Sequence, residues 1–437
     1  MRKLAVIAAL ALLTASCGQL PGVHDNAVRS GEVPAGGLGP GTDIGADPGT
    51  DPGADPGSSP GAGGNGGGGG GGGVSPPPPG GGNTTGITAT TIKIGIHAPL
   101  TGAAPISPTS FRTGTPLYWE NNKVFGKNVQ VVFEDDQYNP SHAKQVCQKM
   151  VEQDKVFLLL GGGGTDQVQS CARYAASVGV PYLSAGTTEV GIRGLDNYFA
   201  VSESYAQQGP QLAQYIKREF TTDAARVAMV VTDTPNFDDA VTAFTEAFPG
   251  VKVFRPAKNQ RGGSMAGNLC TGNVKNYDVV YPLTAPTYYL EMAAAAQCHP
   301  QYAGVGITMG LDQVADTGCS GNRPTENGVF FSPAPAFADS NDYDPKFRQA
   351  GGSDDIMWLL WGLMKSLHQL FLETGEDLSR ERFIAASESA TVKTGVYPDV
   401  QYAPDDRFGA KQVHVLKNVC TGDGGHYVTL EAFKSSF

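Results

Sequence analysis

The chain has little positive charge and none of the usual metal-binding spacings. Its 437 residues contain 31 Lys and Arg against 42 Asp and Glu, which gives a formal net charge of -11. No basic run follows the first few residues, and this argues against nucleic acid or an anionic membrane surface as the partner. CxxC and HExxH spacings are absent and the seven His are scattered, so we expect no metal and no cofactor.

The first 17 residues predict export. Met1–Cys17 has two early cations, an apolar run and small residues that end in Cys. This pattern is typical of a secretory signal peptide and is too short to remain as a membrane-spanning helix. Leu13–Cys17 resembles a bacterial lipoprotein cleavage box, although Thr14 stands where that box usually has Leu. We therefore expect Cys17 to be lipidated and the protein to be extracytoplasmic, in the periplasm or at the cell surface; the alternative is ordinary secretion with a free Cys17.

The cysteines that remain after Cys17 form an even set. Export together with an even number of cysteines favours disulfides over a zinc site. Among the many pairings that six cysteines allow, we predict the sequential one: Cys147 with Cys171, Cys270 with Cys298, and Cys319 with Cys420.

Residues 18–86 are rich in Gly, Pro, Ser and Asp, with repeated Asp-Pro-Gly and the glycine run Gly66–Gly73. Such a segment cannot bury enough apolar surface to fold. We predict a disordered tether here, with the folded domain spanning residues 87–437.

Strand-like and helix-like segments alternate after Thr91. Ile92, Ile94 and Ile96 alternate along a strand that runs into a small-residue loop. Val156–Leu160 is a continuous apolar run, as expected of a parallel strand covered on both faces. Ser141–Gln153 has helical spacing with Ser141 placed to cap it. Two such series in succession predict an α/β fold with two doubly wound lobes.

The longest predicted helix is Asp354–Leu372. Trp358 and Trp361 on this helix invite the interpretation of an aromatic ligand box. They belong to a broad apolar face, however, and we expect them to pack in the core.

The ordered series of these segments resembles the type I periplasmic binding proteins of the branched-chain amino-acid (Leu/Ile/Val-binding) group, which serve ABC importers. The similar stretches cover nearly all of residues 91–416: Thr91–Gly102, Asn122–Asp136, Pro140–Met150, Val180–Thr188, Tyr198–Tyr215, Arg226–Ala240, Asn327–Ser332 and Val400–Leu416. The resemblance implies two Rossmann-like lobes joined by a three-crossing hinge. Lobe one would span about 87–205 and 331–387, and lobe two about 206–330 and 388–437.

The loops that follow the strands are the expected binding site. Gly161–Thr165 opens a helix, where glycines admit a ligand to the backbone and the helix N-terminus offers N–H groups to an anion. By resemblance, Thr165, Gly186 and Thr188 correspond to positions that bind a ligand carboxylate. Their neighbours Gly164, Ser184 and Thr187 complete the two loops. The alternative roles are a plain helix cap for Thr165 and ordinary turn residues for the second loop.

Lobe two is expected to supply the other wall of the site. Phe237 comes after Thr234-Pro235-Asn236, and Tyr281 and Thr284 stand at the end of a strand, where the aromatic rings could cover an apolar ligand. A core role for Tyr281 is the alternative. Tyr205 stands where the family can have an Asp, and Gly304–Gly310 lacks the Glu expected to meet a ligand ammonium group. Glu203 or Asp312 would have to substitute, or the ligand is not an α-amino acid.

The sequence therefore predicts a non-enzymatic solute-binding protein that holds an amino acid or a related small carboxylate or amide, with a membrane permease as its partner. A ligand-sensing domain for a membrane receptor is the first alternative. The second is a serine acyl-enzyme of the penicillin-binding type. It rests on the SxxK pattern Ser141–Lys144 and the KTG pattern Lys393–Gly395, but no SDN motif lies between them.

Overall fold

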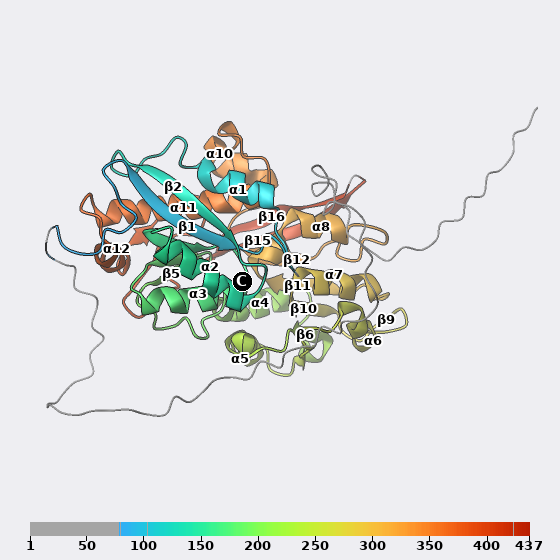
Figure 1. The fold of residues 1–437 in the computed structure, drawn as a ribbon. Helices are drawn as coiled ribbons and strands as arrows, with labels where there is room; N and C mark the ends of the chain where they lie inside the picture. The colour runs from blue at the N-terminus through green and yellow to red at the C-terminus, as the bar shows by residue number, and fades with distance from the viewer. Residues whose placement is uncertain (1–77, 79, 103, 423) are drawn as a thin grey trace, which may run out of the picture. The chain divides into compact units, whose positions relative to one another are not determined.

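The computed structural model describes residues 78, 80–102, 104–422 and 424–437. The first of its two large sheets is wholly parallel, in the order β2-β1-β3-β4-β5 (Figure 1). Leu158 and Leu160 of the central strand pack into the core on one face and Leu159 into that on the other, because successive side chains of a strand alternate. The strands are β1 (Thr91–Ala98), β2 (Asn128–Asp135), β3 (Leu158–Gly161), β4 (Tyr182–Ser184) and β5 (Tyr198–Ala200).

Helices cover both faces of the first sheet. α2 and α3 pack on the face of Leu159, and α1, α11 and α12 on the other. Their bounds are α1 (Pro108–Leu117), α2 (Pro140–Glu152), α3 (Thr165–Ser177), α11 (Asp355–Thr374) and α12 (Arg380–Ser387). The predicted helix cap at Ser141 is wrong by two residues, because the side chain of Asn139 caps α2.

The second sheet has the order β16-β15-β12-β11-β10-β6-β7, with β15 and β16 antiparallel to their neighbours. α4 and α5 pack on one face, and α7 and α8 on the other. The strands are β6 (Val227–Val231), β7 (Lys252–Phe254), β10 (Val279–Leu283), β11 (Gln301–Val305), β12 (Val329–Ser332), β15 (Val413–Thr421) and β16 (Gly424–Lys434); the helices are α4 (Tyr205–Glu219), α5 (Asp238–Ala247), α7 (Pro286–Ala295) and α8 (Asp312–Gly318). The predicted α/β class with two doubly wound lobes is confirmed.

The chain passes between the sheets three times: after β5, after β12 and before β15. The third passage comes later than residue 388, where the resemblance placed it. Residues before β15 still pack on the first sheet, where the Tyr402 hydroxyl donates to the Ala200 carbonyl (2.9 Å) and the Ala200 N–H donates to the Arg407 carbonyl (2.9 Å).

Short elements complete the described chain. They are α6 (Ala266–Leu269), α9 (Ser340–Tyr343), α10 (Pro345–Gln349), β8 (Cys270–Thr271), β9 (Val274–Lys275), β13 (Thr391–Val392) and β14 (Val400–Gln401), with single 3-10 turns at Ala224–Arg226, Pro235–Phe237, Gly262–Met265, Ile307–Gly310 and Phe337–Asp339.

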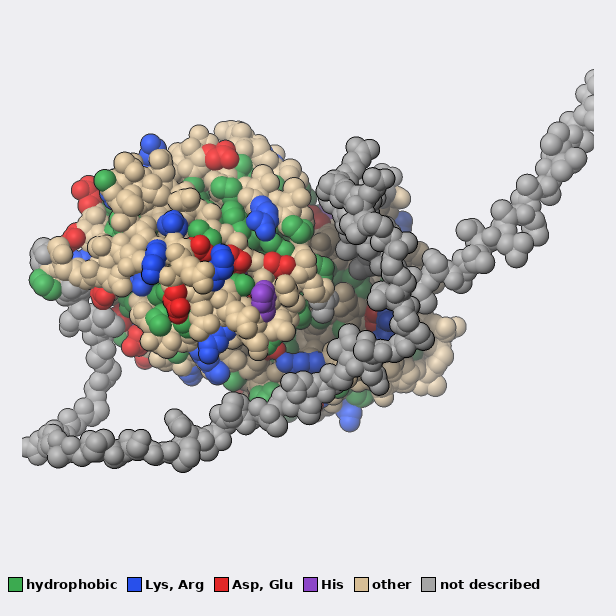
Figure 2. Space-filling view, in the orientation of Figure 1, with side chains coloured by type: hydrophobic (Ala, Val, Ile, Leu, Met, Phe, Trp, Pro, Cys, Tyr) green, Lys and Arg blue, Asp and Glu red, His purple; other side chains and the backbone are tan. Residues whose placement is uncertain are grey.

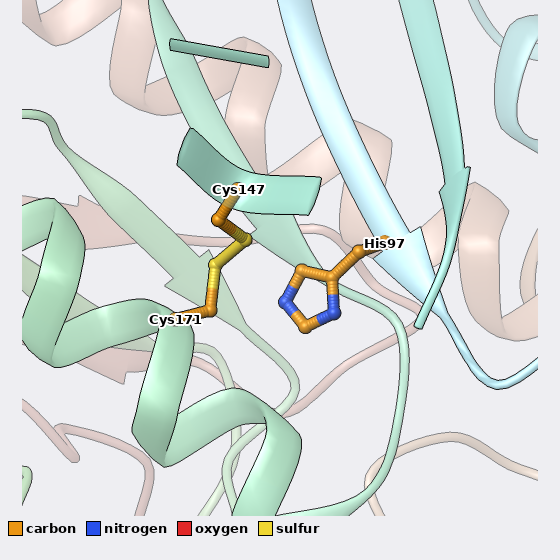
Figure 3. A group of neighbouring side chains, drawn as sticks. All are labelled: His97, Cys147 and Cys171. Atoms are coloured by element: carbon orange, nitrogen blue, oxygen red, sulfur yellow. A yellow bond between two sulfur atoms is a disulfide. The ribbon is translucent and has the colours of Figure 1, made fainter. Parts of the chain in front are cut away.

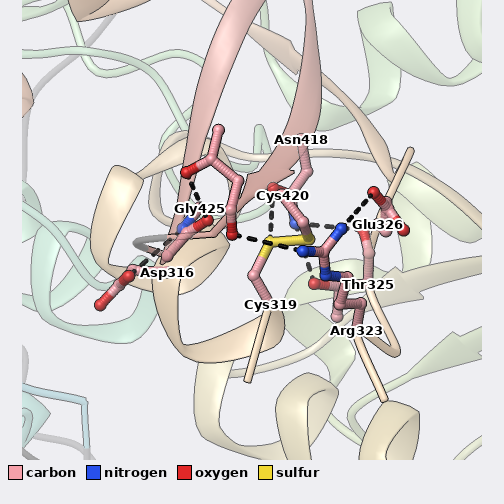
Figure 4. The surroundings of a disulfide bond; sticks show 10 residues. Asp316, Cys319, Arg323, Thr325, Glu326, Asn418, Cys420 and Gly425 are labelled. Carbon is pink, nitrogen blue, oxygen red and sulfur yellow. Dashed lines mark hydrogen bonds and ion pairs between the residues drawn. A yellow bond between two sulfur atoms is a disulfide. The ribbon is translucent and has the colours of Figure 1, made fainter. Parts of the chain in front are cut away.

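Three disulfides join the same pairs that the sequence predicted. Cys147–Cys171 links α2 to α3, and Cys270–Cys298 links β8 to the segment after α7. Cys319–Cys420 ties the end of α8 to β15, beside Asn418 and Thr325 (Figure 4). Each bond therefore joins elements that pack side by side.

The folded part begins before residue 87, which corrects the predicted tether boundary. The Gly80 N–H donates to Asp377 (2.9 Å), and the Asn83 N–H donates to Glu381 (2.7 Å). Within the described residues, no helix is long and apolar enough to cross a membrane. The predicted signal peptide, its lipidated Cys17 and the rest of the tether, apart from residues 78 and 80–86, lie outside the described residues.

The α11 tryptophans are core residues, as predicted. Trp358 and Trp361 are both buried, and the Trp361 indole N–H donates to Asp344 (3.0 Å). This arrangement satisfies the polar atom and leaves the ring in the core.

Candidate functional site

The N-terminus of α3 lies at the centre of the candidate site. Gly164 occupies the N-cap position with φ +79°, and no side chain caps the helix. Thr165, the first helical residue, approaches the Tyr205 hydroxyl and lowers the pKa of that group, although the larger effect of burial raises it. Helix N–H groups, a threonine and a tyrosine are thus brought together, and ligand contacts for Gly164, Thr165 and Tyr205 stay predictions.

Tyr205 also joins this cluster to the second lobe. Its ring centroid lies 6.1 Å from that of Phe237. A Cβ placed on Gly306, directly after β11, would lie 3.8 Å from the Tyr205 ring. Gly306 has φ +115°, so a glycine here both permits the backbone turn and leaves room in front of the ring.

Tyr281 reaches the same region from β10. Its side chain is fully buried and packs edge-on against Phe244 at 4.9 Å, so a core role is part of its function. Burial raises the pKa of its hydroxyl well above the usual value, and the nearby Tyr205 and Asp239 raise it further. The hydroxyl finds no hydrogen-bond partner among the described residues, and such a buried group favours a ligand that supplies one.

Tyr138 is a neighbour of the site that the sequence did not reveal. The carboxylate of Asp136 accepts the Tyr138 N–H (3.0 Å), and Tyr138 has φ +54°. Burial raises the pKa of Tyr138 to about 12, and the nearby Asp166, Tyr205 and Asp136 raise it further. The available signal was the pair Asp135-Asp136 at the end of a strand, since such carboxylates hold turns in place.

The second predicted loop, Ser184–Thr188, is mostly engaged by the protein itself. The Ser184 hydroxyl lies 2.6 Å from the Tyr198 hydroxyl and accepts the Gly186 N–H (3.1 Å). Gly186 has φ +89°, and a Cβ there would lie 2.7 Å from the Ser202 Oγ. Thr187 is buried. Ligand contacts for these three residues stay predictions.

Thr188 bridges the two lobes. Its hydroxyl lies 2.5 Å from the Asn236 carbonyl oxygen and 3.1 Å from both carboxylate oxygens of Asp239. Asn236 in turn donates to Asp166, and its side-chain oxygen accepts from Gln169 (3.0 Å). Lys258 pairs with Asp166 at 2.6 Å. Residues beside α3 and α5 are therefore in direct contact.

Thr284 follows β10, as predicted, but its hydroxyl donates to the Ala285 carbonyl (3.2 Å). The acids considered as ammonium partners are also engaged. Gln211 donates to both carboxylate oxygens of Glu203 (2.8 and 2.7 Å), and the Tyr427 N–H donates to Asp312 (2.8 Å).

A groove of about 670 Å³ runs between α2 and α3 and reaches Asn236. Lys144, Gln148 and Arg173 are among its lining residues, and none of the predicted ligand residues lines it. Figure 2 shows the face around α2 and α3 with Lys, Arg, Asp and Glu interspersed, so no single charge dominates there.

His97, Cys147 and Cys171 are the one group among the described residues with metal-ligand atoms close together (Figure 3). The two sulfur atoms are bonded to each other, whereas a metal needs thiolates. Both His97 ring nitrogens are occupied, by Asp136 at 2.8 Å and Tyr182 at 2.7 Å. This group is thus a structural cluster.

The acyl-enzyme motifs do not form a catalytic site. Ser141 and Lys144 are exposed on α2. Lys393 directly follows β13. Its backbone N–H donates to Gln369 of α11 (2.6 Å), and its ammonium group lies 3.4 Å from the Asp399 carboxylate. A nucleophilic serine needs its base within hydrogen-bond reach.

Two open α/β sheets that meet at the loops after their strands define a two-lobed binding fold, in which ligands lie outside the carboxyl ends of the strands. The sequence profile of the periplasmic binding protein family matches residues 91–422. The chain belongs to this family of periplasmic binding proteins, a class of non-enzymatic proteins.

Solved structures share the fold at low identity. A solute-binding protein of an ABC transporter from Rhodopseudomonas palustris BisB5, in complex with 3,4-dihydroxybenzoic acid, is 18% identical, with TM-score 0.63 over 79% of this chain and 98% of that one. A fatty acid ABC transporter substrate-binding protein from Thermomonospora curvata is 15% identical, with TM-score 0.65 over 81% and 95%. The leucine binding protein LivK from Thermotoga maritima is 17% identical, with TM-score 0.61 over 77% and 97%. No curated protein sequence is significantly similar.

Proposed function

We propose that this protein is the extracytoplasmic solute-binding component of an ABC importer, and that it holds an amino acid or a related small carboxylate or amide between its lobes. The observation that carries the proposal is the uncapped N-terminus of α3, with Thr165 beside Tyr205, whose ring lies 6.1 Å from that of Phe237. A helix N-terminus attracts carboxylates through its N–H groups and its dipole.

Closure of the lobes is the signal that a permease would read. The bonds of Thr188 to Asp239 and of Asp166 to Lys258 join segments that belong to different sheets. A solute that contacts both lobes shifts the population toward the closed form, because only that form offers both sets of contacts.

The relatives support a small acid as the solute class. The Rhodopseudomonas palustris protein is in complex with a dihydroxybenzoic acid, and the Thermomonospora curvata protein is named for fatty acids. Both ligands carry a carboxylate, the group that the α3 N-terminus suits.

Export and lipidation at Cys17 belong to the same proposal. Three disulfides favour an oxidising compartment outside the cytoplasm. A lipid at Cys17 would keep the protein near its permease, and mass spectrometry of the N-terminal peptide from the native host measures that modification.

A thermal-shift screen of the full chain against amino acids, amides and small carboxylates tests the binding function. A solute present at about 100 times its Kd should stabilise the protein by about 2.7 kcal/mol. Stabilisation by no member of these classes contradicts the proposal. Uptake of the identified solute by cells with and without the gene then tests import.

A further inference from the structure

The candidate site is rich in aromatic rings and hydroxyl groups. Tyr205, the first residue of α4, lies beside Thr165 at the N-terminus of α3, and Tyr205 and Phe237 pack on the second-lobe cluster that contains Tyr281. Gly306 places no side chain against the Tyr205 ring, where a Cβ would lie 3.8 Å away. A flat ring fits such surroundings, because aromatic rings pack edge-on or offset against one another.

The nearby carboxylates are already used by the protein. Asp136 contacts His97 (2.8 Å) and the Tyr138 N–H (3.0 Å), and Asp166 pairs with Lys258 (2.6 Å) and Asn236. Asp239 accepts from the Thr188 hydroxyl and from the N–H groups of Glu189 and Ala240 (2.9 and 2.7 Å). A solute ammonium group would therefore find no carboxylate reserved for it, and an unpaired buried charge is costly.

The Tyr281 hydroxyl is an independent observation that points to a ligand. It is fully buried, has no partner among the described residues, and belongs to the cluster of buried side chains on which Tyr205 and Phe237 pack. A polar group of the solute that reached this hydroxyl would remove the cost of leaving it unsatisfied.

We propose that the solute is an aromatic carboxylate without an ammonium group. Its carboxylate lies at the N-terminus of α3, its ring lies against Tyr205 and Phe237, and a ring hydroxyl meets the Tyr281 hydroxyl. This inference rests on the proposed solute-binding function and narrows it to one class of solute.

Calorimetric titration of the full chain with three matched probes tests each part. The probes are 3-(4-hydroxyphenyl)propanoate, L-tyrosine, which adds only the ammonium group, and 3-phenylpropanoate, which lacks only the ring hydroxyl. We expect the hydroxyphenyl acid to bind at least 100-fold more tightly than L-tyrosine, and about 10-fold more tightly than the phenyl acid.

Tyr281→Phe should weaken binding of the hydroxyphenyl acid about 10-fold and leave binding of 3-phenylpropanoate unchanged. Tyr302→Phe is the matched control. Tyr302 is also a buried tyrosine on a strand of the second sheet, and its hydroxyl has no partner in the described chain. Its ring packs against Tyr289 on the face of the sheet opposite to that of Tyr281. That variant should bind all three probes as the wild type does.

The outcomes separate this inference from the function on which it rests. Binding of L-tyrosine as tightly as its deaminated analogue overturns the inference while solute binding stands. Binding of amides or aliphatic acids alone, found in the thermal-shift screen, also overturns the aromatic class and leaves solute binding intact. Failure of every solute class removes the binding function itself.

Discussion

The hydroxyl of Thr188, in the loop after β4, lies 3.1 Å from both carboxylate oxygens of Asp239 in the first turn of α5. The loop of Thr188 follows a strand of the first sheet, and α5 follows β6 of the second. The Glu189 N–H adds a further bond to the same carboxylate at 2.9 Å. The two lobes therefore share a hydrogen-bonded contact that exists only when they are close together.

Thr188→Val should weaken solute binding about 10-fold or more. Valine keeps the shape of the side chain but removes a hydrogen bond to a charged group, and such bonds contribute about 1.5–3 kcal/mol. The loss falls on the closed form and so lowers the apparent affinity. Calorimetric titration with a solute identified in the thermal-shift screen measures the change.

Thr115→Val is the control for this prediction. The Thr115 hydroxyl is also buried, but it donates to the Phe111 carbonyl (2.9 Å) within α1. Its loss should leave solute affinity as it was. Equal affinities for the wild type and Thr188→Val would contradict the assigned role of the interlobe bond.

The fold was predictable from the sequence because its signals are local. The continuous apolar run at Val156–Leu160 reflects a strand that is buried on both faces. The alternation of Ile92, Ile94 and Ile96 reflects the neighbouring strand β1, whose three isoleucines face the same core. The position of Gly164 and Thr165 at the start of a helix was predictable for the same reason, since they stand a few residues after the buried strand β3.

The parts that escaped prediction depend on contacts between distant segments. Thr188 is used by Asp239, 51 residues away, and nothing in either local sequence indicates that pairing. The Tyr138 backbone has positive φ in a turn that the Asp136 carboxylate holds through the Tyr138 N–H. Residues 80–86 look like a tether by composition, and their order comes from partners on α12 and the segment before it.

Glu203→Gln should change how stability depends on pH. Burial raises the pKa of Glu203 from 4.5 to about 7, although the hydrogen bond from Gln211 and the charge of Lys411 lower it. The folded state then binds the proton more tightly than the unfolded state does. Its contribution to the free energy of unfolding is present below about pH 4.5 and is lost as the pH rises to about 7.

Urea unfolding at pH 5 and pH 8 measures this effect. The difference in unfolding free energy between Glu203→Gln and the wild type should move in favour of the variant by about 2–3 kcal/mol from pH 5 to pH 8. Asp355, whose pKa burial also raises to about 7, is present in both proteins, so its titration cancels in the comparison. A difference that does not vary with pH would rule out a raised pKa at Glu203.

Loss of the Cys319–Cys420 disulfide should cost more stability than loss of Cys270–Cys298. The first closes a sequence separation of 101 residues and the second one of 28. Chain entropy predicts a loss of about 4–5 kcal/mol for the long loop and about 3–4 kcal/mol for the short one. Paired Cys→Ala variants, unfolded in urea, give both values, and the reverse order would show that packing around the bonds outweighs loop length.

His97→Leu should destabilise the protein through Asp136. Both side chains are fully buried, and the Asp136 carboxylate loses its 2.8 Å partner when the imidazole is removed. Breaking a buried pair by removing one member costs about 3–5 kcal/mol, whereas removing both members is far less harmful. The double variant His97→Leu/Asp136→Leu should therefore recover part of the unfolding free energy that His97→Leu loses. Urea unfolding of the two variants provides the comparison, and a double variant less stable than His97→Leu would mean that the bond from Asp136 to the Tyr138 N–H matters more than the burial of its charge.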